Sequence, residues 1–167
     1  MNLPRSPLCF ALIALWLCVF PLAASAQTCT VSSTGASFGN YDYTNGNSTT
    51  GTITLNCTLS LLTNVSVALS AGTSPGATIN NRMMAQLAPA GSDHLSYGLY
   101  QNATSGPLCA GGVVWGNTPA TEPAPIGFLI VGPGFPHSWT VYGCAPSGQD
   151  SSVASYGDTV TITITWQ

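Results

Sequence analysis

A serine in a short glycine-rich segment is the first candidate for chemistry. Gly72-Thr-Ser74-Pro-Gly76 matches the G-x-S-x-G pattern, in which a nucleophilic serine sits at a sharp turn. That chemistry also needs a backbone N–H from the residue after the serine, to stabilise an oxyanion. Here that residue is Pro75, which has no N–H. We therefore interpret the segment as a turn. Since no convincing acid–base or nucleophile set occurs elsewhere, the sequence predicts a protein that is not an enzyme.

Histidines and cysteines raise the question of a zinc site. His94 and His137 accompany four cysteines that lie beyond residue 26. Zinc sites show close ligand spacings such as C-x-x-C or H-x-x-x-H, and this chain has neither. Cysteines joined in disulfides cannot bind a metal. We expect no metal site and no cofactor.

Arg82 is the only Lys or Arg beyond residue 5. One interpretation is a clamp for a carboxylate ligand, because a guanidinium binds carboxylates in a two-pronged geometry. The other is a structural role, either in an ion pair with Asp93, Asp158 or another acid, or as a donor to loop carbonyls. We expect the structural role, as an ion pair.

The first 26 residues have the form of a secretory signal peptide. Arg5 supplies a basic start, Leu8 to Phe20 is an apolar run, and Ala24-Ser-Ala26 has the small-x-small form of a cleavage site. The run is shorter than the roughly 20 residues that span a bilayer, so we expect no membrane span. Cleavage after Ala26 leaves 141 residues, predicted to form one domain over residues 27–167.

The secreted part of the chain is acidic and almost free of cations. Arg82 stands against five Asp and Glu residues, which gives a net charge of −4. A basic surface for nucleic acid is therefore excluded. The even number of remaining cysteines predicts two disulfides, as is usual for an exported domain. The polar surface consists mainly of Ser, Thr, Asn and Gln, and such weak charge repulsion suits a protein that associates with others.

Short alternating segments predict an all-β domain. Thr30–Ser33, Ser37–Tyr41, Gly51–Thr58, Asn64–Ser70 and Trp139–Tyr142 are typical of strands, as are the segments around Leu95–Leu99 and Val113–Trp115. Asn81–Ala88 has room for one or two helical turns. In the Pro-rich stretch from Thr118 to Pro136, the apolar run Ile126–Val131 is either a core strand or an exposed loop. Many short strands joined by turns indicate a β-sandwich or barrel.

The last strand of the sequence has the clearest pattern. Val160, Ile162, Ile164 and Trp166 alternate with threonines from Thr159 to Thr165. No following strand is present to cover its second edge. An uncharged, proline-free edge invites pairing with another chain. The pattern therefore predicts a partner strand from a different molecule.

An ordered set of short motifs runs through the domain beyond the signal peptide. They are Cys29-Thr-Val, Phe38-Gly-Asn-Tyr41, Gly51-Thr-Ile-Thr-Leu-Asn-Cys57, Arg82-Met-Met84, Leu95-Ser-Tyr97-Gly-Leu-Tyr100, Val114-Trp-Gly116 and Tyr156-Gly-Asp158 with the alternating strand to Trp166. This set resembles the spore coat protein U domain family, which includes subunits of archaic chaperone–usher pili. The resemblance covers essentially the whole domain beyond the signal peptide.

The resemblance implies an immunoglobulin-like β-sandwich that lacks its last strand. A periplasmic chaperone, and then the next subunit delivered at an outer-membrane usher, would fill the gap by strand addition. The implied location is the periplasm in transit and then a fibre at the cell surface. The resemblance also implies the disulfide Cys29–Cys57, which leaves Cys109–Cys144 as the second pair. The implied strand-accepting groove contains Phe38, Tyr41, Val160, Ile162, Ile164 and Trp166.

The chain departs from this pattern before Cys29. Subunits that donate a strand carry an alternating extension there, whereas only Gln27 and Thr28 follow the expected cleavage site. We therefore expect a subunit that accepts a strand but gives none, at the tip or end of a fibre. The competing hypothesis is a stand-alone secreted coat protein or a carbohydrate-binding module. The Pro-rich insert between Cys109 and Cys144 is not a recognised family feature, and the sequence assigns it no role.

Overall fold

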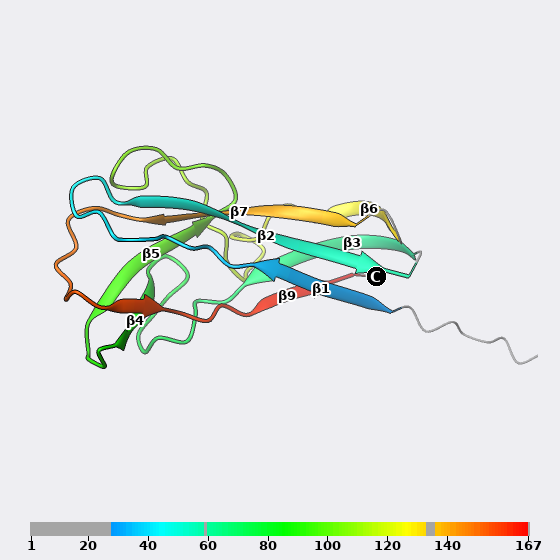
Figure 1. Cartoon of the computed structure of the whole chain (residues 1–167). Coiled ribbons are helices and arrows are strands. Elements are labelled where there is room, and N and C mark those ends of the chain that lie inside the picture. Colours follow the sequence, from blue (N-terminus) through cyan, green and yellow to red (C-terminus); the bar gives the residue numbers. More distant parts are fainter. Residues whose placement is uncertain (1–27, 59, 133–135, 167) are drawn as a thin grey trace, which may run out of the picture.

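The computed structural model describes residues 28–58, 60–132 and 136–166, so the expected signal peptide lies outside the described residues. The described chain is built from strands, turns and irregular loops, and none of it is helical. Figure 1 shows the strands lying lengthwise along an elongated domain. In chain order they are β1 (Cys29–Thr34), β2 (Asn47–Cys57), β3 (Ser60–Leu69), β4 (Arg82–Ala88), β5 (His94–Tyr100), β6 (Ile126–Val131), β7 (His137–Ala145), β8 (Ser155–Gly157) and β9 (Ile162–Thr165).

The strands form two antiparallel sheets of unequal size. The larger sheet has six strands in the order β1-β2-β7-β5-β4-β8, and the smaller has three in the order β6-β3-β9. Apolar side chains from both sheets form two clusters, one around Trp115, Tyr97 and Leu69 and one around Leu55 and Leu62. The arrangement is a β-sandwich, which confirms the all-β prediction.

The inward faces of β2 and β3 follow from their sequence alternation. Ile53, Leu55 and Cys57 of β2 are buried, and the residues between them are half-buried or exposed. In β3 the phase changes once, because Asn64 has a positive φ of 50°. This left-handed residue turns the chain so that Leu62 and Val65, an odd number of positions apart, both face the core.

Several expected elements differ in the structure. Ser37–Tyr41 is irregular, and Val114 forms only an isolated bridge with Tyr100. The helical interpretation of Asn81–Ala88 is wrong, because Arg82–Ala88 forms β4 with Arg82 and Met84 buried on its inner face. The apolar run Ile126–Val131 is a strand, β6, at the edge of the smaller sheet.

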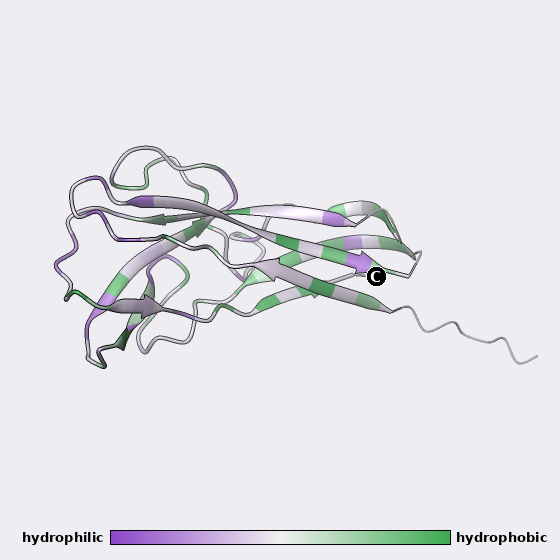
Figure 2. Ribbon diagram, viewed as in Figure 1, coloured by the Kyte–Doolittle hydropathy of each residue, from purple (hydrophilic) through white to green (hydrophobic). Residues whose placement is uncertain are grey.

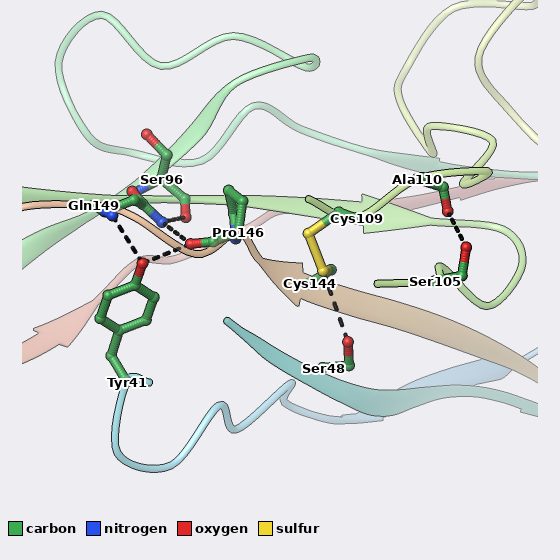
Figure 3. Close-up of a disulfide and its surroundings, with 9 residues drawn as sticks. All are labelled: Tyr41, Ser48, Ser96, Ser105, Cys109, Ala110, Cys144, Pro146 and Gln149. Atoms are coloured by element: carbon green, nitrogen blue, oxygen red, sulfur yellow. Dashed lines mark hydrogen bonds between the residues drawn. A yellow bond between two sulfur atoms is a disulfide. The ribbon is translucent and has the colours of Figure 1, made fainter. Parts of the chain in front are cut away.

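Two disulfides hold loops and edges to this framework. Cys29 and Cys57 lie opposite each other in the β1–β2 ladder and are bonded, so the bridge fixes the first residue of β1 to the last residue of β2. Cys109 and Cys144 are also bonded and attach the β5–β6 loop to β7. The Ser48 hydroxyl of β2 contacts the Cys144 sulfur (Figure 3).

A strand-sized groove between the sheets

The two sheets do not close over one another along their whole length. A groove of about 1300 Å³ lies between them. Its floor is apolar and comes from both sheets. Ile53, Tyr97 and Val141 belong to the larger sheet, and Leu69 and Ile162 belong to the smaller sheet. These side chains belong to the main core cluster. The groove therefore reaches into the centre of the sandwich.

The segment Ser33–Tyr41 forms one wall of the groove. The Phe38 ring lies against Gly143, where an added Cβ would approach the ring carbons to 3.0 Å, and makes an edge-to-face contact with Tyr97 at 5.7 Å. Gly143 thus leaves room for an aromatic ring on the inner face of β7. Phe38 covers part of the core that a regular strand would otherwise cover.

The Tyr41 hydroxyl anchors this wall to the opposite side of the groove. It donates to the Pro146 carbonyl at 2.7 Å and accepts from the Gln149 N–H at 3.0 Å. Figure 3 shows the ring of Tyr41 reaching across to Pro146 and Gln149. The Gln149 side-chain amide accepts from Ser96 N–H at 2.6 Å and donates to Ser96 C=O at 2.9 Å. Gln149 thereby pairs with β5 as a strand would, at a residue that β7 does not reach.

The second wall is the segment from Gln149 to Asp158. Ser152 donates to the Asp93 carboxylate through both its N–H, at 2.9 Å, and its hydroxyl. These bonds lower the pKa of Asp93 below its ordinary value. Side-chain contacts, in place of a regular ladder, therefore hold much of this wall.

Asp158 fixes the chain just before the terminal strand. It accepts from the Tyr97 hydroxyl at 2.6 Å and from the Thr73 N–H at 2.8 Å. Gly72, with a φ of +97°, has no room for a side chain because a Cβ would collide with the Asp158 carboxylate. Burial, helped by Asp158, raises the pKa of the Tyr97 phenol far above its ordinary value, so its hydroxyl stays protonated and donates.

The outer edge of β9 is open. Ser70 N–H donates to Thr161 C=O at 3.0 Å, and the register continues with Ala68 opposite Thr163. Because antiparallel bonds alternate, the backbone groups of the threonines face β3 and those of Ile162 and Ile164 face away. Within the described residues no strand pairs with that side of β9.

β1 presents a second open edge. Thr58 N–H donates to Thr28 C=O at 2.9 Å, so in the same alternation the backbone groups of Val31 and Ser33 face away from β2. Ser33 and Thr34 of β1 and Ile162 of β9 line the same groove, so the two open edges border it together. We call this pair of open edges the β1–β9 seam (Figure 1).

The expected groove residues do not all lie together. Phe38, Tyr41, Val160 and Ile162 line the groove. Ile164 packs inward against both core clusters but does not line it, and Trp166 is exposed and outside it. Figure 2 shows green apolar residues alternating with pale residues of intermediate hydropathy along β9. Sequence reasoning missed Gln149 and the second wall, because a glutamine in an irregular polar segment gives no periodic signal.

Arg82 is structural, but the expected ion pair is wrong. The side chain is 0% exposed and donates to four backbone carbonyls, those of Leu69, Ser70, Ile79 and Trp115, at 2.7–3.2 Å. Within the described residues it forms no ion pair with an acid. The carbonyl oxygens of a strand end and two loops accept the hydrogen bonds of the guanidinium, in the place of a carboxylate. Arg82 thus ties β4, in the larger sheet, to the end of β3, in the smaller.

The other candidates for chemistry do not assemble into a site. Ser74 lies in a turn closed by the Ala77 N–H bond to its carbonyl at 3.1 Å. His94 begins β5, whereas His137 begins β7 and contacts the Trp139 ring at 4.4 Å. Among the described residues no group of His, Cys, Asp and Glu is arranged to hold a metal ion. The described part of the chain also contains no helix long and apolar enough to cross a membrane.

These features define a class: an all-β sandwich with an apolar groove beside two unpaired strand edges. The Spore Coat Protein U domain model matches residues 16–163, and the chain belongs to this family. The resemblance drawn from the motifs is thereby confirmed. A relative, "Protein U" of Myxococcus xanthus, is 34% identical over 138 residues, which cover 77% of this chain and 70% of the relative.

A solved structure shares the fold. It is a chain in the crystal structure of the CsuC–CsuE chaperone–tip adhesion subunit pre-assembly complex from archaic chaperone–usher Csu pili of Acinetobacter baumannii. The TM-score is 0.51 at 17% identity, with 83% of this chain and 39% of that chain covered. This chain therefore spans less than half the length of that one.

Proposed function

We propose that this chain is a secreted, non-enzymatic subunit of a bacterial surface fibre of the chaperone–usher type, completed by a strand from another molecule. The observation that carries the proposal is the groove of about 1300 Å³ beside the β1–β9 seam. A strand laid in the seam would pair with the free backbone groups of Ile162 and Ile164. Its alternate side chains would enter the groove, which is the geometry of β-strand addition.

The proposed partners are a periplasmic chaperone, an outer-membrane usher and neighbouring subunits. The fold is shared with a chain from a chaperone–subunit complex, which supports partners of this kind. Two disulfides fit passage through an oxidising compartment. The proposed location is therefore the periplasm in transit and then a fibre at the cell surface.

A stand-alone coat protein is the second candidate function. The family takes its name from a spore coat protein, and Protein U of Myxococcus xanthus is a relative of this chain. A coat protein of this kind would be a stable monomer with the groove empty or filled by a small ligand such as a carbohydrate. The two proposals thus differ in whether the isolated chain is stable.

We further propose a terminal position in the fibre. With cleavage after Ala26, only Gln27 and Thr28 precede the disulfide-bonded Cys29. Two residues extend at most about 7 Å. A donated strand needs roughly 17 Å, so this segment is too short to complete a neighbour. Mass spectrometry of the secreted chain establishes the mature N-terminus on which this proposal depends.

Periplasmic expression tests the main proposal. The chain is exported alone, or together with a peptide of alternating apolar and polar residues, and soluble protein is measured by gel filtration. We expect aggregation or degradation without the peptide and a soluble one-to-one complex with it. A monomer that melts cooperatively without a peptide would favour the coat protein instead.

A further inference from the structure

The charged side chains of this domain are distributed unevenly. Arg82, the only Lys or Arg beyond residue 5, is fully buried. The described surface therefore carries no Lys or Arg side chain. All its formal charge comes from five acids, which are Asp42, Asp93, Glu122, Asp150 and Asp158.

Four of these five acids lie in the walls of the groove or beside residues that line it. Asp150 and Asp158 line it directly. Asp42 lies between Tyr41 and Tyr43, which both line it, and Asp93 holds the lining residue Ser152. We call these four the acidic rim. Glu122 lies apart, in the loop before β6.

The acidic rim marks the end of the groove where β9 begins. Figure 1 shows the loop after β7 and the loop before β2 at the left of the molecule, away from the C-terminus. The side of the groove toward β1, β2 and β9 is lined by Ser33, Thr34, Ile53 and Ile162, which carry no charge. There the strand segments Cys29–Thr34, Thr52–Cys57 and Ile162–Thr165 contain no acidic or basic side chain. The groove therefore has negative charge at one end and no charged side chain at the other.

Local donors hold two carboxylates of the rim, those of Asp42 and Asp93, in their charged form. Asp42 accepts from the Asn45 side chain at 2.9 Å and from the Thr44 and Asn45 N–H groups, and these bonds lower its pKa. Asp93 is affected in the same direction by Ser152. A segment entering this end of the groove meets negative charge, and the described surface has no Lys or Arg beside it.

We infer that the natural occupant of the groove is an extended segment with Lys or Arg at the end that lies beside the acidic rim. This rests on the proposed function, since it describes the strand that would fill the groove. Its centre must be apolar at alternate positions, to match the apolar floor. Its cationic end would be attracted to the rim, and an acidic end would be repelled. Charge complementarity of this kind fixes direction and register more than affinity.

A competition experiment tests the inference. The full secreted chain is unfolded in denaturant with its disulfides intact and refolded with equal amounts of two capped peptides. Both have the same alternating Ile and Thr core, and one ends in Lys-Lys while the other ends in Glu-Glu. A second pair carries the same charges at the N-terminal end. Native mass spectrometry then gives the ratio of the two complexes.

We expect the Lys peptide to be captured in about threefold to tenfold excess over the Glu peptide in one of the two pairs. The preference should shrink at high salt and approach one in the double variant Asp42→Asn, Asp150→Asn. Asp150 lines the groove without a hydrogen bond described for its side chain, and Asn at position 42 keeps an acceptor for the turn. Glu122→Gln, which removes an acid outside the rim, is the matched control and should leave the preference unchanged.

The outcomes separate this inference from the proposal on which it rests. Equal capture of Lys and Glu peptides, or an equal preference from either end, would overturn the cationic end while leaving strand acceptance intact. An equal loss of preference in Glu122→Gln would show a general effect of net charge and would also overturn it. If neither peptide is captured, strand acceptance itself fails and the inference fails with it.

Discussion

Val31 of β1 and Leu55 of β2 lie directly opposite each other in the ladder and point to the same side, yet Leu55 is 0% exposed and Val31 is 46% exposed. Neighbours that share one face of a pleated sheet normally share its cover as well. The cover over β2 comes from the smaller sheet and ends before it reaches β1. The exposed Val31 thus marks the place where one further strand would complete the sandwich.

The first prediction concerns the inward face of β9. Ile162→Asp should abolish rescue of the chain by the alternating peptide, because it places a charge in the apolar groove beside the edge that the peptide must join. Thr163→Asp is the matched control, since Thr163 is exposed and its backbone pairs with Ala68 of β3. Recovery of soluble complex measures both. Equal rescue of the two variants would contradict the groove as the binding site.

The two disulfides should have separable effects. By loop-closure entropy each should stabilise the fold by about 3–4 kcal/mol, since the bridges close loops of 28 and 35 residues. Only Cys29–Cys57 attaches to a strand of the seam, β1. We expect Cys29→Ala, Cys57→Ala to weaken peptide capture strongly, and Cys109→Ala, Cys144→Ala to lower stability with capture largely retained.

Trypsin gives a convenient measurement of these stabilities. Arg82 is the only cleavage site beyond residue 5 and is fully buried, so cutting requires the domain to open. Cleavage after Arg82 should accelerate in both double variants. Peptide mapping that joined Cys29 to Cys109 or Cys144 would contradict the pairing.

Replacement of Arg82, even by lysine, should destabilise the domain. Arg82→Lys should lower the free energy of unfolding of the peptide-complemented chain by about 2–4 kcal/mol, because an ammonium cannot reach all four carbonyls and some stay buried without a donor. Arg82→Met, which removes every donor, should cost at least as much. Urea unfolding followed by tryptophan fluorescence measures both. A Lys variant as stable as the original chain would contradict the carbonyl-binding role.

Acid should loosen the second wall of the groove. The Ser152 bonds lower the pKa of Asp93 below its ordinary value of 3.8, so the folded state favours the charged carboxylate. Its stabilising contribution is then complete above pH 3.8 and is lost as the pH falls through the lower folded value. The melting temperatures of the complemented chain and of Asp93→Asn should converge in that range. A difference that persists unchanged in strong acid would contradict this.

The strands were predictable where one face is buried and the other exposed. Ile53, Leu55 and Cys57 of β2 and Val65, Val67 and Leu69 of β3 alternate in the sequence and are buried in the structure. β4 was missed because its inner face carries Arg82, a residue that no apolar pattern includes. The sequence Asn81–Ala88 then does not distinguish a helix from a strand. Only the tertiary contacts with β5 and β8 select the strand.

Only part of the groove could be predicted from the sequence. Periodicity identified β9 and its apolar face, but it cannot show how far the partner sheet extends or which loop completes a wall. Tyr41 and Gln149 meet across the groove from positions 108 residues apart. The expected ion pair of Arg82 failed likewise, because backbone carbonyls carry no sequence signal.

The last prediction concerns position in the fibre. A subunit that accepts a strand but donates none has no subunit ahead of it, so it would occupy the distal end as one copy per fibre. With cleavage after Ala26, only Gln27 and Thr28 would precede the Cys29–Cys57 bridge, and this motivates the position. Immunogold labelling against this chain should then mark fibre ends alone. As a control, the same chain given an alternating extension before Cys29, together with its intact groove, should be able to add to itself and label along the shaft. Continuous shaft labelling by the original chain would contradict the terminal position and would favour a self-assembling coat layer.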